Sequence, residues 1–176
     1  MGKTVNLRSK SVNLTLPCLI TVFFDQITKL IAGTHLAGRE PIVFLRGFFV
    51  FIYVQNKGAF LSLGGNLGDV VRLIFLTVIP LAILIAAGMY LFKTDKVSLR
   101  QICYFSLILG GGLSNIFDRL FRGGQVVDFM NIGIRNFRTG IFNVADLGII
   151  FGGGLILLSF LRESGQEKNE DKVKNG

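Results

Sequence analysis

Four apolar runs limit what this chain can fold into more than any other feature of its sequence. They cover about residues 12–32, 70–92, 102–117 and 144–161. An α-helix of about 20 mainly apolar residues spans the hydrocarbon core of a bilayer. Hydrophobic residues make up 51% of the chain and charged residues only 17%, which is too apolar for an ordinary soluble domain. We therefore predict an all-α membrane protein with four transmembrane helices.

The two ends of the chain are polar. The first apolar run follows a basic segment, as in a signal peptide, but it is long enough to span a bilayer and no small-x-small cleavage site follows a shorter core. We interpret it as the first membrane helix. Residues 1–161 then form a single integral membrane domain, and the mixed-charge residues 162–176 are expected to be a disordered cytoplasmic tail.

Two long loops, residues 33–68 and 119–143, separate the first two spans and the last two spans. Both contain short stretches rich in β-branched and aromatic residues, which favour strands and are too short to span as helices: 42–45, 48–54, 126–127 and 132–134. We predict that the loops together form a small β-sheet that lies on the membrane surface.

Basic residues predict the orientation of the chain. They are dense in the N-terminal segment, in the short loop at 93–100 and in the tail. Because such residues gather on the cytoplasmic side, both termini are predicted to be cytoplasmic and both long loops, with their sheet, to face outward. Some arginines depart from this rule and need another role: Arg119, Arg122, Arg135 and Arg138.

The net charge of +8 fits basic loops that meet anionic lipid headgroups, so membrane lipid is an expected partner and nucleic acid is not. One histidine and no Cys-x-x-Cys pair provide no basis for a metal site. We expect neither a metal nor another cofactor.

Acidic residues next to the apolar runs are the candidates for function. Asp118, Asp128 and Asp146 all lie between residues 110 and 146, although the chain has only 11 acidic residues. Asp25 and Lys29 lie four residues apart in the first run and share one helix face. They could form a structural ion pair, with Lys29 reaching the interface, or present an acid to the interior of the bundle. Carboxylates are costly at such places and are interpreted by default as functional.

Four short motifs stand in order along the chain: DQITK at 25–29, NKGAF at 56–60, SNIFDR at 114–119 with VVDF at 126–129, and FNVAD at 142–146. Together they closely resemble the motifs of the lipoprotein signal peptidases, also called signal peptidase II, over about residues 12–161. The resemblance implies an aspartyl endopeptidase of the bacterial inner membrane, acting near its outer face. Such an enzyme removes the signal peptide from prolipoproteins, cutting just before a diacylglyceryl-modified cysteine. We expect it to act as a monomer.

The resemblance also implies roles for individual residues. The catalytic pair is Asp128 and Asp146. The substrate-binding residues are Asn56, Gly58, Asn115, Arg119 and Asn143. Asp25, Lys29 and Asp118 are expected to support the site, and Asp118 stays outside the catalytic pair because an adjacent Asp and Arg are usually structural. Two residues depart from the family pattern and affect the expected shape of the substrate pocket: Ser114, where glycine is common, and Phe60, where a second small residue is common.

The chemistry is reasonable without the family. Peptide hydrolysis by carboxyl groups needs one carboxylate as base and one carboxylic acid as proton donor, and two carboxyls that share a site hold one proton between them. Two other functions remain open from the residues alone. Paired membrane acids also relay protons in transporters, and acids that only pair with arginines occur in structural assembly proteins. Carboxyls that meet at the outer surface favour hydrolysis, whereas carboxyls at the midplane favour transport.

Overall fold

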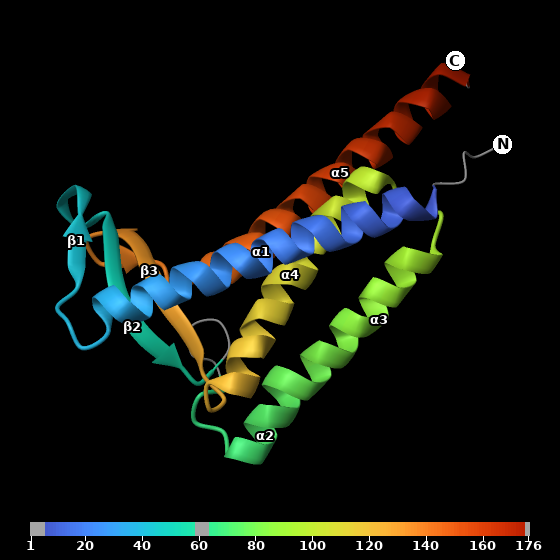
Figure 1. Cartoon of the computed structure of the whole chain (residues 1–176). Helices are drawn as coiled ribbons and strands as arrows, with labels where there is room; N and C mark the ends of the chain where they lie inside the picture. The colour runs from blue at the N-terminus through green and yellow to red at the C-terminus, as the bar shows by residue number, and fades with distance from the viewer. Residues whose placement is uncertain (1–5, 59–63, 175–176) are drawn as a thin grey trace.

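The computed structural model of the protein describes residues 6–58 and 64–174, with side chains described up to Ser164 (Figure 1). The helices are α1 (Leu7–Leu36), α2 (Asp69–Leu73), α3 (Ile79–Lys93), α4 (Leu99–Phe121) and α5 (Val144–Lys174), with a π-helical turn, η3 (Ile74–Val78), joining α2 to α3. The strands are β1 (Ile42–Phe44), β2 (Phe49–Asn56), β3 (Val126–Ile134) and β4 (Phe137–Arg138), and a short 3₁₀ turn, η1 (Leu45–Gly47), separates β1 from β2.

Helix α1 has its polar side chains inside and its apolar side chains outside. Its buried positions include Thr21, Asp25 and Lys29, which recur at one-turn spacing, while Phe23 and Phe24 on other faces are exposed. Water would reverse this distribution, because it favours polar side chains on the surface. The exposed apolar faces are therefore suited to lipid, and the polar interior is available for a site.

Helix α4 is the centre of the bundle, because three successive glycines let three other helices approach it. A methyl group added at Gly110 would meet the backbone of α1 at Cys18, and one at Gly111 would meet the backbone of α5 at Ala145. At Gly112 it would meet Leu84 of α3, at 2.7 Å. Successive helical residues point about 100° apart, so each glycine serves a different neighbour. The glycine run therefore permits close helix contacts in three directions.

Three of the predicted spans correspond to helices long and apolar enough to cross a membrane: Leu7–Leu36, Asp69–Lys93 and Val144–Ser164. The predicted span at 102–117 corresponds to α4, which is 23 residues long but does not reach that level of hydropathy within the described chain. Its lower hydropathy has a physical reason. The last turns of α4 carry Ser114, Asn115 and Asp118, and these side chains face the interior of the bundle rather than lipid.

The two long loops form one antiparallel sheet in the order β1-β2-β3-β4, which confirms the predicted β platform. The two strands expected at 126–127 and 132–134 are one continuous strand, β3. The short β4 was not predicted. The register of β2 against β3 shifts between Phe51 and Val54, after which Val54 lies opposite Asp128 and Asn56 opposite Val126.

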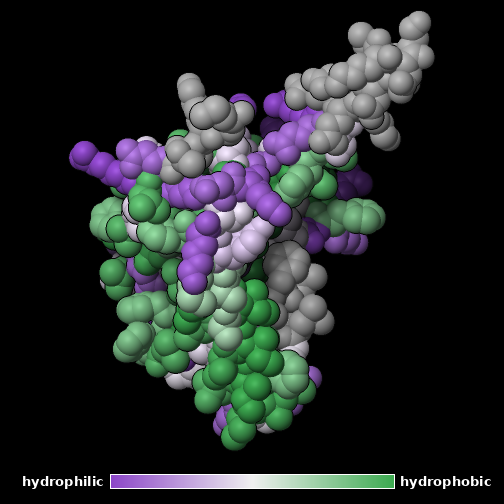
Figure 2. Space-filling model, turned by 90° about the vertical axis from the view of Figure 1, so that its right-hand side faces the viewer, coloured by the Kyte–Doolittle hydropathy of each residue, from purple (hydrophilic) through white to green (hydrophobic). Residues whose placement is uncertain are grey.

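The sheet and the chain termini lie at opposite ends of the helices (Figure 1). The start of α1 and the α3–α4 loop meet at the terminal end, where Lys10 pairs with Asp95 at 2.6 Å. Figure 2, which looks toward that end, shows hydrophilic side chains near the termini and hydrophobic ones over the lower part of the view. The tail that was expected to be disordered from residue 162 instead continues α5 as helix to Lys174.

Candidate active site

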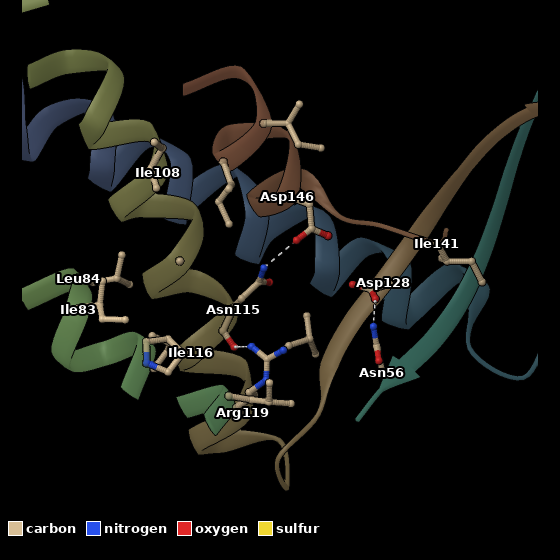
Figure 3. Close-up of a pocket in the computed structure, with 16 residues that line it drawn as sticks. Asn56, Ile83, Leu84, Ile108, Asn115, Ile116, Arg119, Asp128, Ile141 and Asp146 are labelled. Atoms are coloured by element: carbon tan, nitrogen blue, oxygen red, sulfur yellow. Dashed lines mark hydrogen bonds between the residues drawn. The ribbon is translucent and has the colours of Figure 1, made fainter. Parts of the chain in front are cut away.

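A cavity of about 540 Å³ opens beside α4, where the helices meet the sheet (Figure 3). Its lining is apolar on the side of α3, α4 and α5, from Ile83, Leu84 and Ile149 among others. Its polar side chains gather at one end: Asn56, Asn115, Arg119, Asp128 and Asp146. A mostly apolar cavity with a few converging polar groups is the usual form of a small-molecule or peptide site.

Asp146 is positioned by the start of α5. Asn143 precedes the helix, and its Oδ1 accepts a hydrogen bond from the Asp146 amide at 3.0 Å. The Asp146 Oδ2 accepts in return from the Asn143 amide at 3.1 Å. This reciprocal pair is a capping box, which satisfies amides at the helix start and fixes both side chains. The Asp146 Oδ1 also accepts from the Asn115 amide group at 2.9 Å, so the carboxylate is held from α4 as well.

Asp128 is positioned by the sheet. It lies on β3, and its Oδ2 accepts from the side-chain amide of Asn56, at the end of β2, at 2.9 Å. Its Oδ1 accepts from the Asn143 side-chain amide at 2.7 Å. Asn143 therefore binds one carboxyl through its Nδ2 and caps the helix of the other through its Oδ1. The two aspartates, 18 positions apart in sequence, are joined through this one residue.

Asp128 is buried, with 3% of the residue exposed. This burial raises its pKa from 3.8 to about 6, because a carboxylate loses its hydration there. The Asp146 charge raises the pKa further, whereas the hydrogen bonds from Asn56 and Asn143 and the Lys29 charge lower it. Neither Asp128 nor Asp146 forms an ion pair within the described part of the chain. Asp128 is thus held by neutral amides and can change protonation near neutral pH.

Arg119 forms the rim between α4 and the end of β2. Its guanidinium donates to the Gly58 carbonyl at 2.9 Å and to the Asn115 carbonyl at 3.3 Å. Gly58 in turn donates its amide to Asn56 Oδ1 at 2.9 Å. The Arg119 Nε is buried and has no hydrogen-bond partner among the residues that the structure describes. The predicted substrate-binding residues are therefore brought to one cavity or to its immediate support.

A second acidic cluster lies behind the cavity. The Lys29 ammonium pairs with Asp25 at 2.6 Å and with Asp118 at 2.8 Å, and all three side chains are fully buried. Lys29 also donates to Asn115 Oδ1 at 3.0 Å, so three acceptors surround it. Both interpretations of Asp25 are thus partly right, since the acid faces the interior and is ion-paired. The idea that Lys29 reaches the interface is wrong.

This cluster holds the backbone next to each aspartate of the cavity. Asp25 Oδ1 accepts from the amide of Ala145, one residue before Asp146, at 2.8 Å. Asp118 Oδ2 accepts from the amide of Val127, one residue before Asp128, at 3.2 Å. The supporting residues predicted from the sequence therefore act through the chain segments that carry Asp128 and Asp146. Asp118 is paired with Lys29 and, at 3.5 Å, with Arg122 rather than with its neighbour Arg119.

Two further residues of this network were not assigned a role. Gln26 donates to Asp118 Oδ1 at 2.9 Å and to the Ser114 hydroxyl at 2.9 Å. Ser114 donates to Asp25 Oδ2 at 2.7 Å, so the serine that departs from the family pattern joins the network. The one sequence signal that could have identified Gln26 is that a polar residue stands beside Asp25 within an apolar run. The other departure, Phe60, lies outside the described residues.

Comparisons of this chain with known proteins all indicate one family. Residues 18–162 match the profile of the family described as signal peptidase (SPase) II. The lipoprotein signal peptidase of Treponema denticola is 36% identical over 165 residues, covering 89% of this chain and 95% of the relative. That of Borrelia turicatae is 33% identical over 170 residues, covering 92% and 97%.

Two solved structures, each described as a bacterial membrane enzyme, have the same fold. One is 28% identical with a TM-score of 0.77, covering 94% of this chain and 95% of the other; the second is 29% identical with a TM-score of 0.73, covering 92% and 97%. Apolar helices around a cavity with a polar end, in a fold shared with these structures, thus define a bacterial membrane enzyme. The chain belongs to the signal peptidase II family. It is therefore a peptidase, and the resemblance found in its motifs is confirmed.

Proposed function

We propose that this peptidase is of the aspartyl type, with Asp128 and Asp146 as its catalytic pair. The observation that carries the proposal is the single cavity that both carboxyls line, from different elements and joined through Asn143. Neither carboxyl forms an ion pair in the described chain. No paired cation therefore holds both carboxyls in the ionised form, and the pair can share one proton. A second carboxylate nearby and burial both favour such sharing.

The proposed reaction uses one water molecule. The ionised carboxylate of the pair removes a proton from that water, and the oxygen of the water attacks the scissile carbonyl carbon. The protonated carboxyl of the pair then gives its proton to the leaving nitrogen as the carbon–nitrogen bond breaks. The Arg119 guanidinium and the amides of Asn56 and Asn115 lie where they can hydrogen-bond an extended peptide backbone at the polar end of the cavity.

The substrate follows from the family and from the shape of the cavity. The family acts on prolipoproteins, and we infer that this enzyme removes their signal peptide by cutting before a diacylglyceryl-modified cysteine. The apolar wall from α3, α4 and α5 supports this choice, because acyl chains can lie against Ile83, Leu84 and Ile149 while the peptide bond meets the carboxyls. Asp146 lies in the first turn of α5 and Asp128 on strand β3 of the sheet, and this placement at one end of the helices supports hydrolysis at a membrane surface over transport through the midplane.

The proposed topology places both termini in the cytoplasm and the sheet, with the cavity, at the outer face of a bacterial inner membrane. Helix α4 then crosses the bilayer as the third span, shielded from lipid on its polar face by α1 and α5. Reporter fusions at Gly64, at Gly123 and at both termini test this arrangement. An outward C-terminus would contradict it.

The function is tested by incubating the purified protein with a diacylated prolipoprotein and following release of the signal peptide. Asp128→Asn should abolish cleavage, while Glu40→Gln, which changes an exposed acid, should cleave at the wild-type rate. A substrate whose target cysteine is not diacylated should be cut far more slowly. Folded Asp128→Asn protein that cleaves normally would rule out the aspartyl mechanism, and equal cleavage of the two substrates would rule out the proposed lipid requirement.

A further inference from the structure

A second cavity, of about 350 Å³, lies beside the proposed active site and shares Arg119 with it. Three cationic side chains from separate segments line it: Lys57 follows β2, Arg72 belongs to α2, and Arg119 comes from the end of α4. Among the described residues, Asp69 is the one acidic side chain of its lining. Lys57 and Arg72 have no role in the proposed reaction, whereas Arg119 also belongs to the rim of the first cavity.

The positive charge of this cavity is only partly neutralised. Asp69 pairs with Arg72, but the Asp69 side chain is 91% exposed to solvent, where screening weakens the pair. Lys57 and Arg119 have no ion-pair partner within the described residues, and the Nε of Arg119 is buried without a hydrogen bond there. An anion that enters the cavity would therefore meet Lys57, which has no ion-pair partner among the described residues, and Arg119, whose charge also interacts with Asp128 and Asp146 of the first cavity.

The cavity is also at the level where a membrane begins. Asp69 is the first residue of the apolar helix Asp69–Lys93. Leu73 lines the cavity and is 51% exposed, and Val70, one turn away, is 70% exposed. A lipid whose acyl chains lie on these apolar side chains would have its headgroup beside Lys57 and Arg72. The helix wall contains the π turn η3, a feature found frequently at functional sites, and the buried Thr77 of that turn lines the cavity.

We propose that this cavity binds the phosphate of an anionic phospholipid, as a site distinct from the peptide-cleaving one. Arginine and lysine together suit phosphate, because a guanidinium offers paired donors and an ammonium offers a compact charge. The exposed leucine and valine favour a phosphate that carries acyl chains over a free one. The diacylglyceryl group of the proposed substrate has no phosphate, so this lipid is a separate molecule. The phosphate of this bound lipid places a negative charge beside Arg119 and so links membrane composition to the rim of the active site.

The test measures lipid binding to the full-length protein in neutral detergent, by native mass spectrometry and by thermal shift. Phosphatidylglycerol, phosphatidylcholine and inorganic phosphate serve as separate probes. We expect phosphatidylglycerol to be retained and to raise the unfolding temperature, and Lys57→Gln to weaken its binding about fivefold, as expected for one interfacial cation. Lys57 is exposed, so this variant should fold. Arg39→Gln, a matched change of an exposed arginine after α1, should leave binding unchanged.

Three outcomes would overturn the proposal. Equal weakening by Arg39→Gln would show that diffuse surface charge attracts the lipid. Phosphatidylcholine retained as well as phosphatidylglycerol, with no effect of Lys57→Gln, would show that the cationic lining is irrelevant. Inorganic phosphate that stabilises as strongly as the lipid would assign the cavity to a free anion. Asp128→Asn should retain lipid binding, so a failure of the aspartyl mechanism would not affect this result.

Discussion

Two acidic clusters lie within one network, and they differ in whether a cation touches them. In the inner cluster, Lys29 contacts both Asp25 and Asp118, and burial is complete. In the cavity, Asp128 and Asp146 accept hydrogen bonds from the amides of Asn56, Asn115 and Asn143, and no cation forms an ion pair with them within the described residues. An ammonium fixes the charge of a carboxylate, whereas a neutral amide allows its protonation to change. Under the proposed mechanism, the same residue type thus serves structure in one cluster and chemistry in the other.

The contact between the clusters runs through the backbone. Asp25 and Asp118 bind the amides of Ala145 and Val127, which immediately precede the two cavity aspartates. Asn115 adds a side-chain link, because it accepts from Lys29 and donates to Asp146. The inner cluster therefore determines where the outer carboxyls lie without supplying the reacting groups. Substitutions should separate the two roles, with the outer cluster controlling turnover and the inner one controlling folding.

The largest effect is expected from the outer cluster. Asp128→Asn and Asp146→Asn should each lower the rate of prolipoprotein cleavage by at least about 1000-fold, because each removes a group that must exchange a proton in the reaction. The double variant should lose little more, since residues that act as a unit are not additive. Cleavage rates per folded molecule, with size-exclusion elution as the check of folding, provide the measurement. Losses that multiply would mean that the two carboxyls act independently.

Removing the cation of the inner cluster should instead affect folding. Lys29→Met leaves two buried carboxylates without their partner, and breaking a buried pair in this way costs about 3–5 kcal/mol. We expect a low folded yield and a large fall in unfolding temperature. Asp118→Asn should act in the same direction and reduce folded yield more than turnover per folded molecule. Lys96→Met, at an exposed lysine outside both cavities, is the matched control. A stable Lys29→Met protein that has lost only activity would place Lys29 in the chemistry.

The sequence predicted the outer cluster better than the inner one, for a physical reason. Asp128, Asp146 and their amide partners lie in short motifs whose order is specific, so a resemblance located them. The partners of Asp25 depend on helix packing, which no local pattern encodes. That packing brings Ser114 and Gln26 to the same carboxyls and makes Lys29 internal. The polar residues that α4 contributes to this packing also lower its hydropathy. For this reason the span predicted from its apolar run is not among the helices of the described chain that are apolar enough to cross a membrane.

The sheet shows the same limit of prediction from the sequence. β-Branched and aromatic residues predicted β1 and β2 closely, but β4 has only two residues and no sequence signal of its own. It pairs because the turn at Arg135, which takes a positive φ of 52°, returns the chain onto β3. The tail beyond residue 161 looked disordered from its charge, yet α5 continues through it, since no proline or glycine pair interrupts the helix.

A smaller effect is expected from pH. Asp128 has a folded pKa of about 6, above the ordinary 3.8, so the folded protein binds this proton more tightly than the unfolded chain. The stability of the folded state should therefore fall as pH rises from about 4 through 6, and the loss should be complete above that range. Relative to Asp128→Asn, the wild type should lose at most about 3 kcal/mol across this window. Unfolding temperatures at pH 4.5, 5.5, 6.5 and 7.5 measure it.

Glu40→Gln, at an exposed acid, is the control for that series and should track the wild type at every pH. A constant difference between wild type and Asp128→Asn over the whole range would mean that Asp128 titrates normally. The proposed distinction between the two clusters would then fail.

The smallest effect is expected at Arg119, which forms the rim of the cavity. Arg119 reaches two carbonyls, at Gly58 and Asn115, through separate nitrogens of its planar guanidinium. Lysine keeps the charge but loses this fork, so Arg119→Lys should lower cleavage about tenfold, the equivalent of one lost hydrogen bond to a charged group. Arg138 also makes two such contacts, to Asn131 and Gly47, but it is exposed and far along the sheet. Arg138→Lys should therefore cleave normally. If both variants cleave equally, the fork of Arg119 has no part in positioning the site, and its charge alone explains its place beside the two aspartates.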